Sequence, residues 1–179
     1  MRTIIVNDKM QTNYTYTTVA GVGKLPSHFT PTVTPKQMLE LGVFGGKYMT
    51  DCRDEFPASW FKSAKLSPDH YDKSINRFGV RASKSLKYWQ DSGWIREEDP
   101  RGWFQWYCRF YLGRRIPEYD EWQITRWRNI RRHLTYILNR YEVDDLTGSP
   151  VRRQALLHWA TLVDGTFTKE QLIRSFELT

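Results

Sequence analysis

Residues Asp99 to Arg115 have the sequence DPRGWFQWYCRFYLGRR, and this stretch decides the fold. Between Pro100 and Leu112, apolar side chains cover most of the circumference of the helix that the pattern favours. A helix that is apolar on all sides is normally buried in a core. We therefore expect a helix that starts at Asp99 and Pro100, stops at Gly113 and lies at the centre of the domain.

Three polar side chains interrupt this apolar helix, namely Arg101, Gln105 and Arg109. Their spacing of four residues places them on one face. A guanidinium and an amide among Trp and Tyr rings could bind a base or a phosphate. Alternatively, Arg109 could pair with a buried acid and Gln105 with the backbone. Arg114 and Arg115 follow the helix, where they would extend a cationic track or simply interact with the helix dipole.

The other predicted helices have recognisable start and stop signals. Thr34, Pro35 and Gln37 form a capping-box pattern, and Gly42 is a stop signal. Comparable signals predict a short helix after Pro57, a helix from the Ser83 cap to Gly93, a long helix of about twenty-five residues from Pro117, one capped by Ser149, and a last one behind Thr168 with Gln171 as its capping-box partner.

The N-terminal part differs in pattern, because NYTYTTV alternates Tyr with Thr and the next residues contain Gly and Pro breaks. We predict an arm or hairpin over residues 1–34. Residues 35–179 then form the helical domain. The fold class is a mainly α, single compact domain of six or seven helices with a short N-terminal β or loop arm.

The charge is unevenly distributed along the chain. The net charge is +7, and the region from Arg96 to Arg153 contains twelve arginines and no lysine. A basic balance favours an anionic partner such as nucleic acid, an acidic membrane surface or a phosphorylated small molecule. Arginine can grip phosphate with two parallel hydrogen bonds and stack on rings, which lysine cannot do. Compositional drift is the alternative explanation for the uneven distribution of lysine and arginine along the chain.

Several classes of protein are disfavoured. Aromatic residues make up 15% of the chain, which supplies enough apolar surface for a core and argues against disorder. No apolar run is long enough to span a membrane or to act as a secretory signal. Cys52 and Cys108 have no metal-ligand spacing and form no disulfide framework, so we expect no metal, no cofactor and an intracellular location, cytoplasmic or nuclear.

The long helix combines an apolar stripe with basic residues. Arg128 and Arg132 line one face, Arg131 lies beside them, and Arg126 is close to Trp122. Basic residues interleaved with exposed Trp are typical of surfaces that follow a nucleic-acid backbone and stack bases. A solvated charged face is the alternative.

The glycine-rich stretch LGVFGGKYMTD, residues 41–51, resembles a phosphate-binding loop but does not match one. The glycine spacing is one residue short, Tyr48 stands where Ser or Thr is needed, and a helix precedes it instead of a strand. We interpret it as a helix stop and a tight turn that positions Lys47 and Asp51. These two are candidate catalytic residues, with Asp51 as acid or base, or they serve only local pairing.

The blocks LGVFGGKYMTDC and DPRGWFQWYCRFYLGRR, with QITRWRNIRRH and RRQALLHWA downstream, resemble an uncharacterised family of bacterial and fungal proteins. The resemblance covers about residues 34–160 and implies no particular activity. A much more distant likeness is to the small helical domains of DNA-base hypermodification systems, which are related to helical DNA glycosylases. The chain lacks the helix-hairpin-helix glycine motif of those glycosylases.

The favoured function is nucleic-acid binding, with DNA preferred, through an Arg- and aromatic-lined site that recognises or processes a base. The residues expected to contact nucleic acid are Arg101, Gln105, Arg109, Arg114, Arg115, Arg128 and Arg132. Two alternatives remain open. One is an enzyme that acts on a phosphorylated or nucleotide-like small molecule. The other is a Trp- and Arg-rich module that docks a protein partner.

Overall fold

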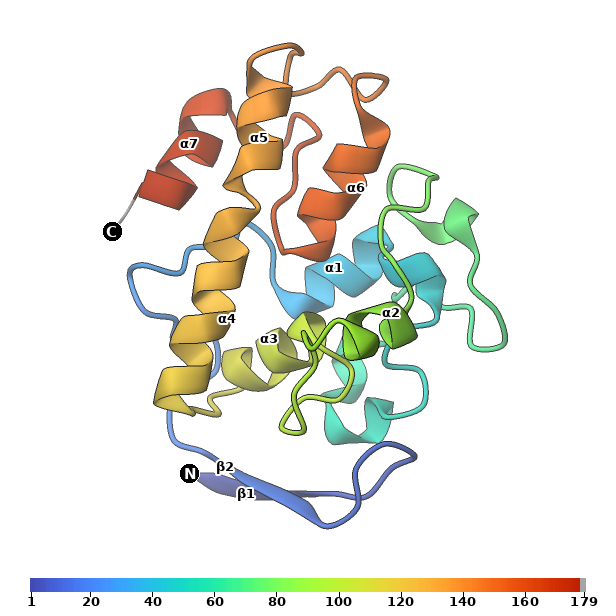
Figure 1. The fold of residues 1–179 in the computed structure, drawn as a ribbon, viewed down its shortest axis with the longest axis vertical. Helices are drawn as coiled ribbons and strands as arrows, with labels where there is room; N and C mark the ends of the chain where they lie inside the picture. Colours follow the sequence, from blue (N-terminus) through green and yellow to red (C-terminus); the bar gives the residue numbers. More distant parts are fainter. Residues whose placement is uncertain (178–179) are drawn as a thin grey trace.

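The computed structural model describes residues 1–177 and shows a mainly α domain with a short N-terminal β element (Figure 1). The strands are β1 (Arg2–Val6) and β2 (Tyr14–Thr18), and the α-helices are α1 (Pro35–Leu41), α2 (Leu86–Asp91), α3 (Trp103–Tyr111), α4 (Pro117–Asn129), α5 (Arg131–Leu138), α6 (Pro150–His158) and α7 (Lys169–Glu177). Every helix in this range is too short or too polar to cross a lipid bilayer.

Helix α3 lies at the centre of the core, as its apolar pattern predicts. Every side chain from Trp103 to Phe110 is buried. Phe29, from the segment between the hairpin and α1, places its ring within 6.5 Å of Trp103 and 5.0 Å of Trp127 on α4, measured between ring centroids. One aromatic ring therefore links the N-terminal segment to two helices that are far away in sequence. In Figure 1, α4 and α5 form one side of the domain, and α6 and α7 lie beside α5.

The predicted N-terminal arm is a hairpin that docks on the carboxyl end of α3. Strands β1 and β2 are antiparallel, with Ile4 opposite Tyr16. The ring of Tyr16 is buried against the helical domain, whereas Ile5 on the other face is exposed. Just after β2, the Val19 N–H donates a hydrogen bond of 2.9 Å to the carbonyl oxygen of Gly113. Pairing and docking together hold the hairpin to the domain.

Two helix starts agree with their capping signals. The Thr34 hydroxyl accepts from the Gln37 N–H, and the Gln37 side chain accepts from the Thr34 N–H, which completes the expected box. The same reciprocal pair joins Thr168 to Gln171 at the start of α7. Ser149, however, has a φ of 60°, a left-handed conformation in which its side chain makes no capping bond to α6.

Other boundaries differ from the predictions for local backbone reasons. α3 begins at Trp103 instead of Pro100, because Gly102 has a φ of 83° that is incompatible with a helix. The long helix is broken at Ile130 into α4 and α5. There the Ile130 N–H donates to the carbonyl oxygen of Trp127, and the His133 N–H donates to that of Ile130. Both hydrogen bonds span three residues, as in a 3₁₀ helix, instead of four.

Two predicted helices are shorter than expected. The stretch after Pro57 forms only a single 3₁₀ turn over Ala58–Trp60. The helix expected from Ser83 is α2, which starts after Ser85, where the Ser85 hydroxyl accepts from the Tyr88 N–H. Helix α2 buries none of its side chains, so little packing supports a longer helix there.

The glycine-rich stretch is a tight turn against which another loop packs. Gly42, Gly45 and Gly46 have φ values of 104°, 61° and 71°. The N–H of Ser67 donates to the carbonyl oxygen of Gly46 at 2.8 Å, and the N–H of Arg77 donates to that of Gly42 at 3.0 Å. The glycines therefore permit both a left-handed backbone and close contact with residues 67–77.

His158, at the end of α6, fixes the same turn from the other side. Its Nε2 accepts a hydrogen bond of 3.1 Å from the N–H of Phe44, and its ring stacks on that of Phe44 at 4.2 Å. Burial lowers the pKa of His158 to about 3, so the ring is neutral and its proton lies on Nδ1. The histidine thus has a structural role at this position.

Replacing Gly42 by Ala tests the architectural role of the turn. A Cβ atom there would lie 2.0 Å from the carbonyl oxygen of Ile75. We expect Gly42→Ala to lower the free energy of unfolding by about 2–4 kcal/mol, measured by urea denaturation. Gly79→Ala is the matched control, because Gly79 also has a positive φ of 66° but no atom within 4 Å of the added Cβ. Equal losses in the two variants would contradict the close-packing explanation.

Candidate functional site

The predicted arginine face of α3 is the centre of a buried ion-pair network. The guanidinium of Arg109 is fully buried and makes a two-pronged contact with Glu55, at 2.6 Å from Nε and 2.9 Å from Nη2. Its remaining N–H groups donate to Asp99, to the carbonyl oxygen of Glu98 and to the Gln11 side chain. All five donors of this guanidinium therefore have a partner.

Arg114 shares the acid that Arg109 contacts. The carboxylate of Asp99 is fully buried and lies between the two guanidinium groups, with 3.0 Å from its Oδ1 to Nη1 of each arginine. The Tyr14 hydroxyl lies 3.2 Å from Nη1 of Arg114. The negative charge of Asp99 therefore compensates two buried positive charges, which would be costly to bury alone.

Arg101 occupies the outer end of the same network. Its Nη1 donates to Asp8 at 3.0 Å, and its Nη2 lies 3.3 Å from Asp51. Gln105 is fully buried, and its side-chain oxygen accepts from the N–H of Arg101 at 2.9 Å. The pairing of Arg109 with buried acids and of Gln105 with the backbone is the alternative that the sequence left open.

Four of the residues expected to contact nucleic acid are therefore inside the protein. Arg101, Gln105, Arg109 and Arg114 are at most 3% exposed. Arg115 is half-buried, and its Nη1 donates to the carbonyl oxygens of Phe110 and Arg114, as expected for an arginine at a helix end. In this conformation the five side chains hold the fold, and a role in binding would have to come from other residues.

The two candidate catalytic residues lie in different surroundings. Asp51 is at the surface and contacts Arg101, so the structure brings it to the edge of the Arg109 network. Lys47 is exposed, and within residues 1–177 its ammonium group forms no ion pair. In this range no side-chain hydrogen bond or ion pair joins Lys47 to Asp51, so their catalytic role stays a prediction.

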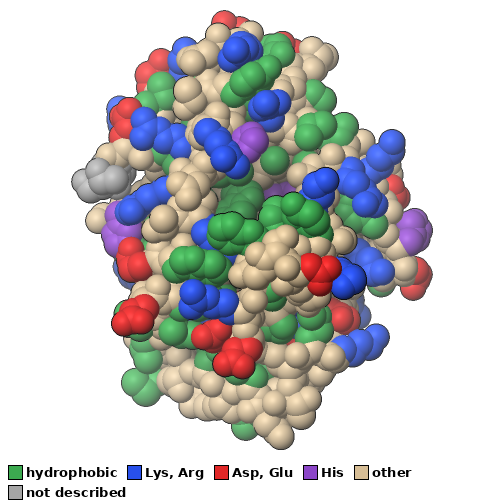
Figure 2. Space-filling view, viewed as in Figure 1, with side chains coloured by type: hydrophobic (Ala, Val, Ile, Leu, Met, Phe, Trp, Pro, Cys, Tyr) green, Lys and Arg blue, Asp and Glu red, His purple; other side chains and the backbone are tan. Residues whose placement is uncertain are grey.

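A second group of arginines lies on α4, α5 and α6 and directly after α5, and its members are exposed or half-buried. We call this group the arginine surface, and its members are Arg126, Arg128, Arg131, Arg132, Arg140 and Arg152. Within the described residues, none of them forms an ion pair with a carboxylate. Figure 2 shows Lys and Arg side chains gathered over α5 and α6, with hydrophobic side chains exposed near the middle of the same face.

The lack of ion pairs over most of this surface follows from its sequence, although Arg140 shares a hollow with Glu142 and Asp145. No Asp or Glu occurs from Trp122 to Tyr141 or from Leu146 to Val163. The positive charges on the two packed helices α5 and α6 therefore add together instead of cancelling.

Tyr136 brings two of these arginines together. The central guanidinium carbon of Arg140 lies 4.1 Å from the centre of its ring, and that of Arg152 lies 3.9 Å from it. Burial lowers the pKa of neighbouring His133, and so do the positive charges of Arg132 and Arg152. An anion bound here would relieve this repulsion.

Sequence reasoning identified Arg128 and Arg132 but missed the part that α6 contributes. Arg140 lies one turn after Tyr136, a spacing that could have predicted their contact. Arg152 comes from a different helix, so only the packing of α5 against α6 brings it to Tyr136.

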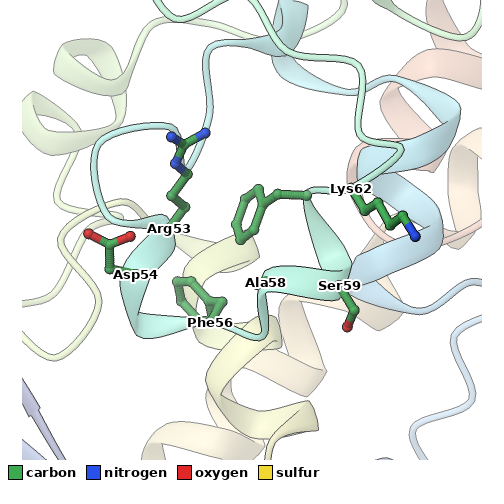
Figure 3. A pocket seen from close by; sticks show the side chains of 7 residues that line it. Arg53, Asp54, Phe56, Ala58, Ser59 and Lys62 are labelled. Atoms are coloured by element: carbon green, nitrogen blue, oxygen red, sulfur yellow. The ribbon is translucent and has the colours of Figure 1, made fainter.

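A hollow lies elsewhere in the described part, away from the arginine surface. It has a volume of about 650 Å³ and is lined by Arg53, Asp54, Phe56, Ala58, Ser59, Phe61 and Lys62. Figure 3 shows Arg53 and Asp54 on one side, with Ser59 and Lys62 pointing away from them. Its charged groups do not converge on a common point, so the hollow offers no evident anion site.

Metal and thiol chemistry have no support in the described residues. No group of three or more His, Cys, Asp or Glu side chains in residues 1–177 could hold a metal ion. Cys52 and Cys108 are both buried, and burial raises the pKa of the Cys52 thiol to about 12. A thiol that is neutral at ordinary pH is a poor nucleophile.

Comparisons of the chain with protein-family models, with curated proteins and with solved structures find no match.

Removing Arg109 should destabilise the protein strongly. Arg109→Met keeps much of the volume but leaves Glu55 buried without its cation, so we expect the free energy of unfolding to fall by about 3–5 kcal/mol in urea denaturation. Arg131→Met is the control at an exposed, unpaired arginine, with an expected change within about 0.5 kcal/mol. A loss below about 1 kcal/mol for Arg109→Met would show that the network does not stabilise the fold.

The network also predicts loss of stability in acid. Burial alone would raise the pKa of Asp8, but hydrogen bonds from the Met10 N–H, the Arg101 side chain and the Gln11 N–H lower it below its ordinary value of 3.8. A lowered pKa contributes stability that is complete above the ordinary value and is lost as the pH falls below it. We expect Asp8→Asn to flatten the decline in unfolding free energy below about pH 4. An unchanged decline would contradict this assignment.

Proposed function

We propose that the protein binds nucleic acid, with DNA favoured, through the arginine surface on α4, α5 and α6. The observation that carries the proposal is the contrast between the two groups of arginines. Arg101, Arg109 and Arg114 are neutralised by buried acids, whereas the six arginines of the surface have no acidic partner in the described residues. Exposed cations without acids attract polyanions.

The extent of the arginine surface favours a polymer over a small phosphorylated molecule. Arg140, two residues after the end of α5, lies fourteen positions after Arg126 on α4, which corresponds to about 20 Å at the rise of a helix. A small metabolite would contact only one end of such a track. A nucleic-acid strand presents a phosphate at each nucleotide and could contact it along its length.

The two alternative functions have weaker support. An enzyme for phosphorylated small molecules needs several cations around one cavity. These arginines are instead spread along α4, α5 and α6, and Arg140 is the one member of the group that lines the hollow at residues 138–145. A module for a protein partner needs exposed aromatic anchors, and Trp94 is the one tryptophan among the large exposed hydrophobic residues of the described chain. Base processing by Asp51 and Lys47 is a further hypothesis that the proposal does not require.

Salt dependence is the direct test of the proposal. Fluorescence anisotropy with a labelled DNA strand should show tight binding at low salt and a linear fall of log K with log salt concentration, because phosphate contacts release counterions. Undetectable binding at low salt, or an affinity that does not depend on salt, would contradict nucleic-acid binding through this surface.

A pair of double variants locates the binding surface. Arg132→Ala/Arg152→Ala should weaken binding and reduce the salt slope by about 1.4 for a single strand, since each lost phosphate contact removes about 0.7. Arg2→Ala/Lys9→Ala removes the same charge from the hairpin, which lies at the opposite end of the domain from α5 and α6 in Figure 1. That control should leave the slope unchanged. Equal effects of the two variants would show that only net charge matters.

A further inference from the structure

A cluster of aromatic rings and arginines adjoins the arginine surface. We call it the tryptophan cluster, and it consists of Trp94, Trp122, Trp159, Arg96 and Arg126. Trp94 comes from the loop after α2, Trp122 from α4, and Trp159 directly follows α6. Three segments that are far apart in sequence therefore converge, and Arg126 belongs to both groups.

The geometry of the cluster is that of a stacking platform. The rings of Trp94 and Trp122 are nearly parallel, with 6.3 Å between their centroids and 17° between their planes. The guanidinium carbon of Arg126 lies 5.0 Å, 4.7 Å and 5.3 Å from the ring centres of Trp94, Trp122 and Trp159. Trp94 is 43% exposed, so part of its ring is free to contact a partner.

The cluster also has uncompensated positive charge. The guanidinium carbon of Arg96 lies 4.4 Å from the Trp122 ring, and within the described residues neither Arg96 nor Arg126 pairs with a carboxylate. The Nη1 of Arg126 donates to the Gln123 side chain at 2.9 Å and to the carbonyl oxygen of Trp94 at 3.3 Å. Burial lowers the pKa of Arg126 to about 10, with Arg96 adding to the effect and Tyr119 opposing it.

A nucleotide with an unpaired base matches both the partly exposed indole ring and the unpaired positive charges of the cluster. Its base offers a flat π-face for the indole ring of Trp94, and its phosphate offers the negative charge that Arg96 and Arg126 lack. In a duplex, each base face is covered by its neighbours in the stack, so only an unpaired base can lie on Trp94.

The cluster lies close enough to the arginine surface for one strand to contact both. Helix α6 connects them, because Arg152 is near its start and Trp159 follows its end. Trp159 lies seven positions after Arg152, which corresponds to about 10 Å along the helix axis. A strand whose phosphates contact the arginines of α5 and α6 could therefore place a neighbouring base at the cluster.

We propose that the tryptophan cluster stacks an unpaired base on Trp94, so that the protein binds single-stranded nucleic acid in preference to duplex. This inference rests on the proposed function, and it adds the form of nucleic acid and the group that recognises it. The arginine surface supplies the salt-dependent affinity, and Trp94 supplies the discrimination between single strand and duplex.

The test compares a labelled oligo(dT) strand with a duplex of the same length, in anisotropy titrations at one salt concentration. The wild type should bind the single strand more tightly. Trp94→Ala should lower single-strand affinity between about 5-fold and 100-fold, with an unchanged salt slope and unchanged duplex affinity. Tyr88→Ala is the control, because Tyr88 is an aromatic residue of similar exposure, at 48%, outside the cluster. It should bind like the wild type.

A second variant separates stacking from misfolding. Trp94→Phe keeps a ring and should retain most of the single-strand affinity, while the quenching of tryptophan fluorescence by oligo(dT) decreases because the stacked indole is gone. Equal affinity of the wild type for single strand and duplex, or full single-strand affinity in Trp94→Ala, would overturn the inference and leave the proposed function intact. No binding of either form would overturn the proposed function itself.

Discussion

The buried guanidinium of Arg109 is the constraint on which the rest of the structure depends. A charge in the middle of a hydrophobic core is costly unless each of its donors is paired. The partners of Arg109 come from the hairpin through Gln11, from the 3₁₀ turn Arg53–Glu55 through Glu55, and from the loop before α3 through Glu98 and Asp99. Satisfying one side chain therefore brings three segments of the chain to α3.

The same requirement explains why this protein has two kinds of arginine. Arg101, Arg109 and Arg114, on and beside α3, face acids, and their charges are compensated inside the fold. The six arginines of the arginine surface are exposed or half-buried and form no ion pair in the described residues, so their field extends outward. The first group gives stability, and the second is the group that we connect with nucleic acid.

Much of the fold could be predicted from local pattern. The burial of α3 follows from its apolar circumference, and the starts of α1 and α7 follow from Thr–Gln capping boxes. The break at Ile130 could not be predicted, because no Gly or Pro marks it and helical propensity continues on both sides. The helix predicted after Pro57 is only a 3₁₀ turn. There the sequence pattern was helical, but it was too short to outweigh tertiary packing.

The candidate site was harder to predict, because it depends on contacts between distant residues. A sequence shows that Arg109 is on an apolar helix but not that Glu55, fifty-four residues earlier, reaches it. Likewise, Trp94 and Trp159 are unremarkable in sequence, and only the convergence of three segments places both beside Arg126. Local periodicity predicts which face of a helix a residue occupies, whereas only the tertiary structure shows which residues pack on that face.

The division of the arginines can be observed directly by heteronuclear NMR of their side-chain N–H groups during titration with single-stranded DNA. We expect the Nε–H signals of Arg126, Arg132 and Arg152 to shift as the strand is added. The signal of Arg109, buried against Glu55, should exchange slowly with solvent and stay in place. The opposite pattern, with Arg109 responding to DNA while Arg126, Arg132 and Arg152 do not, would contradict this division of the arginines.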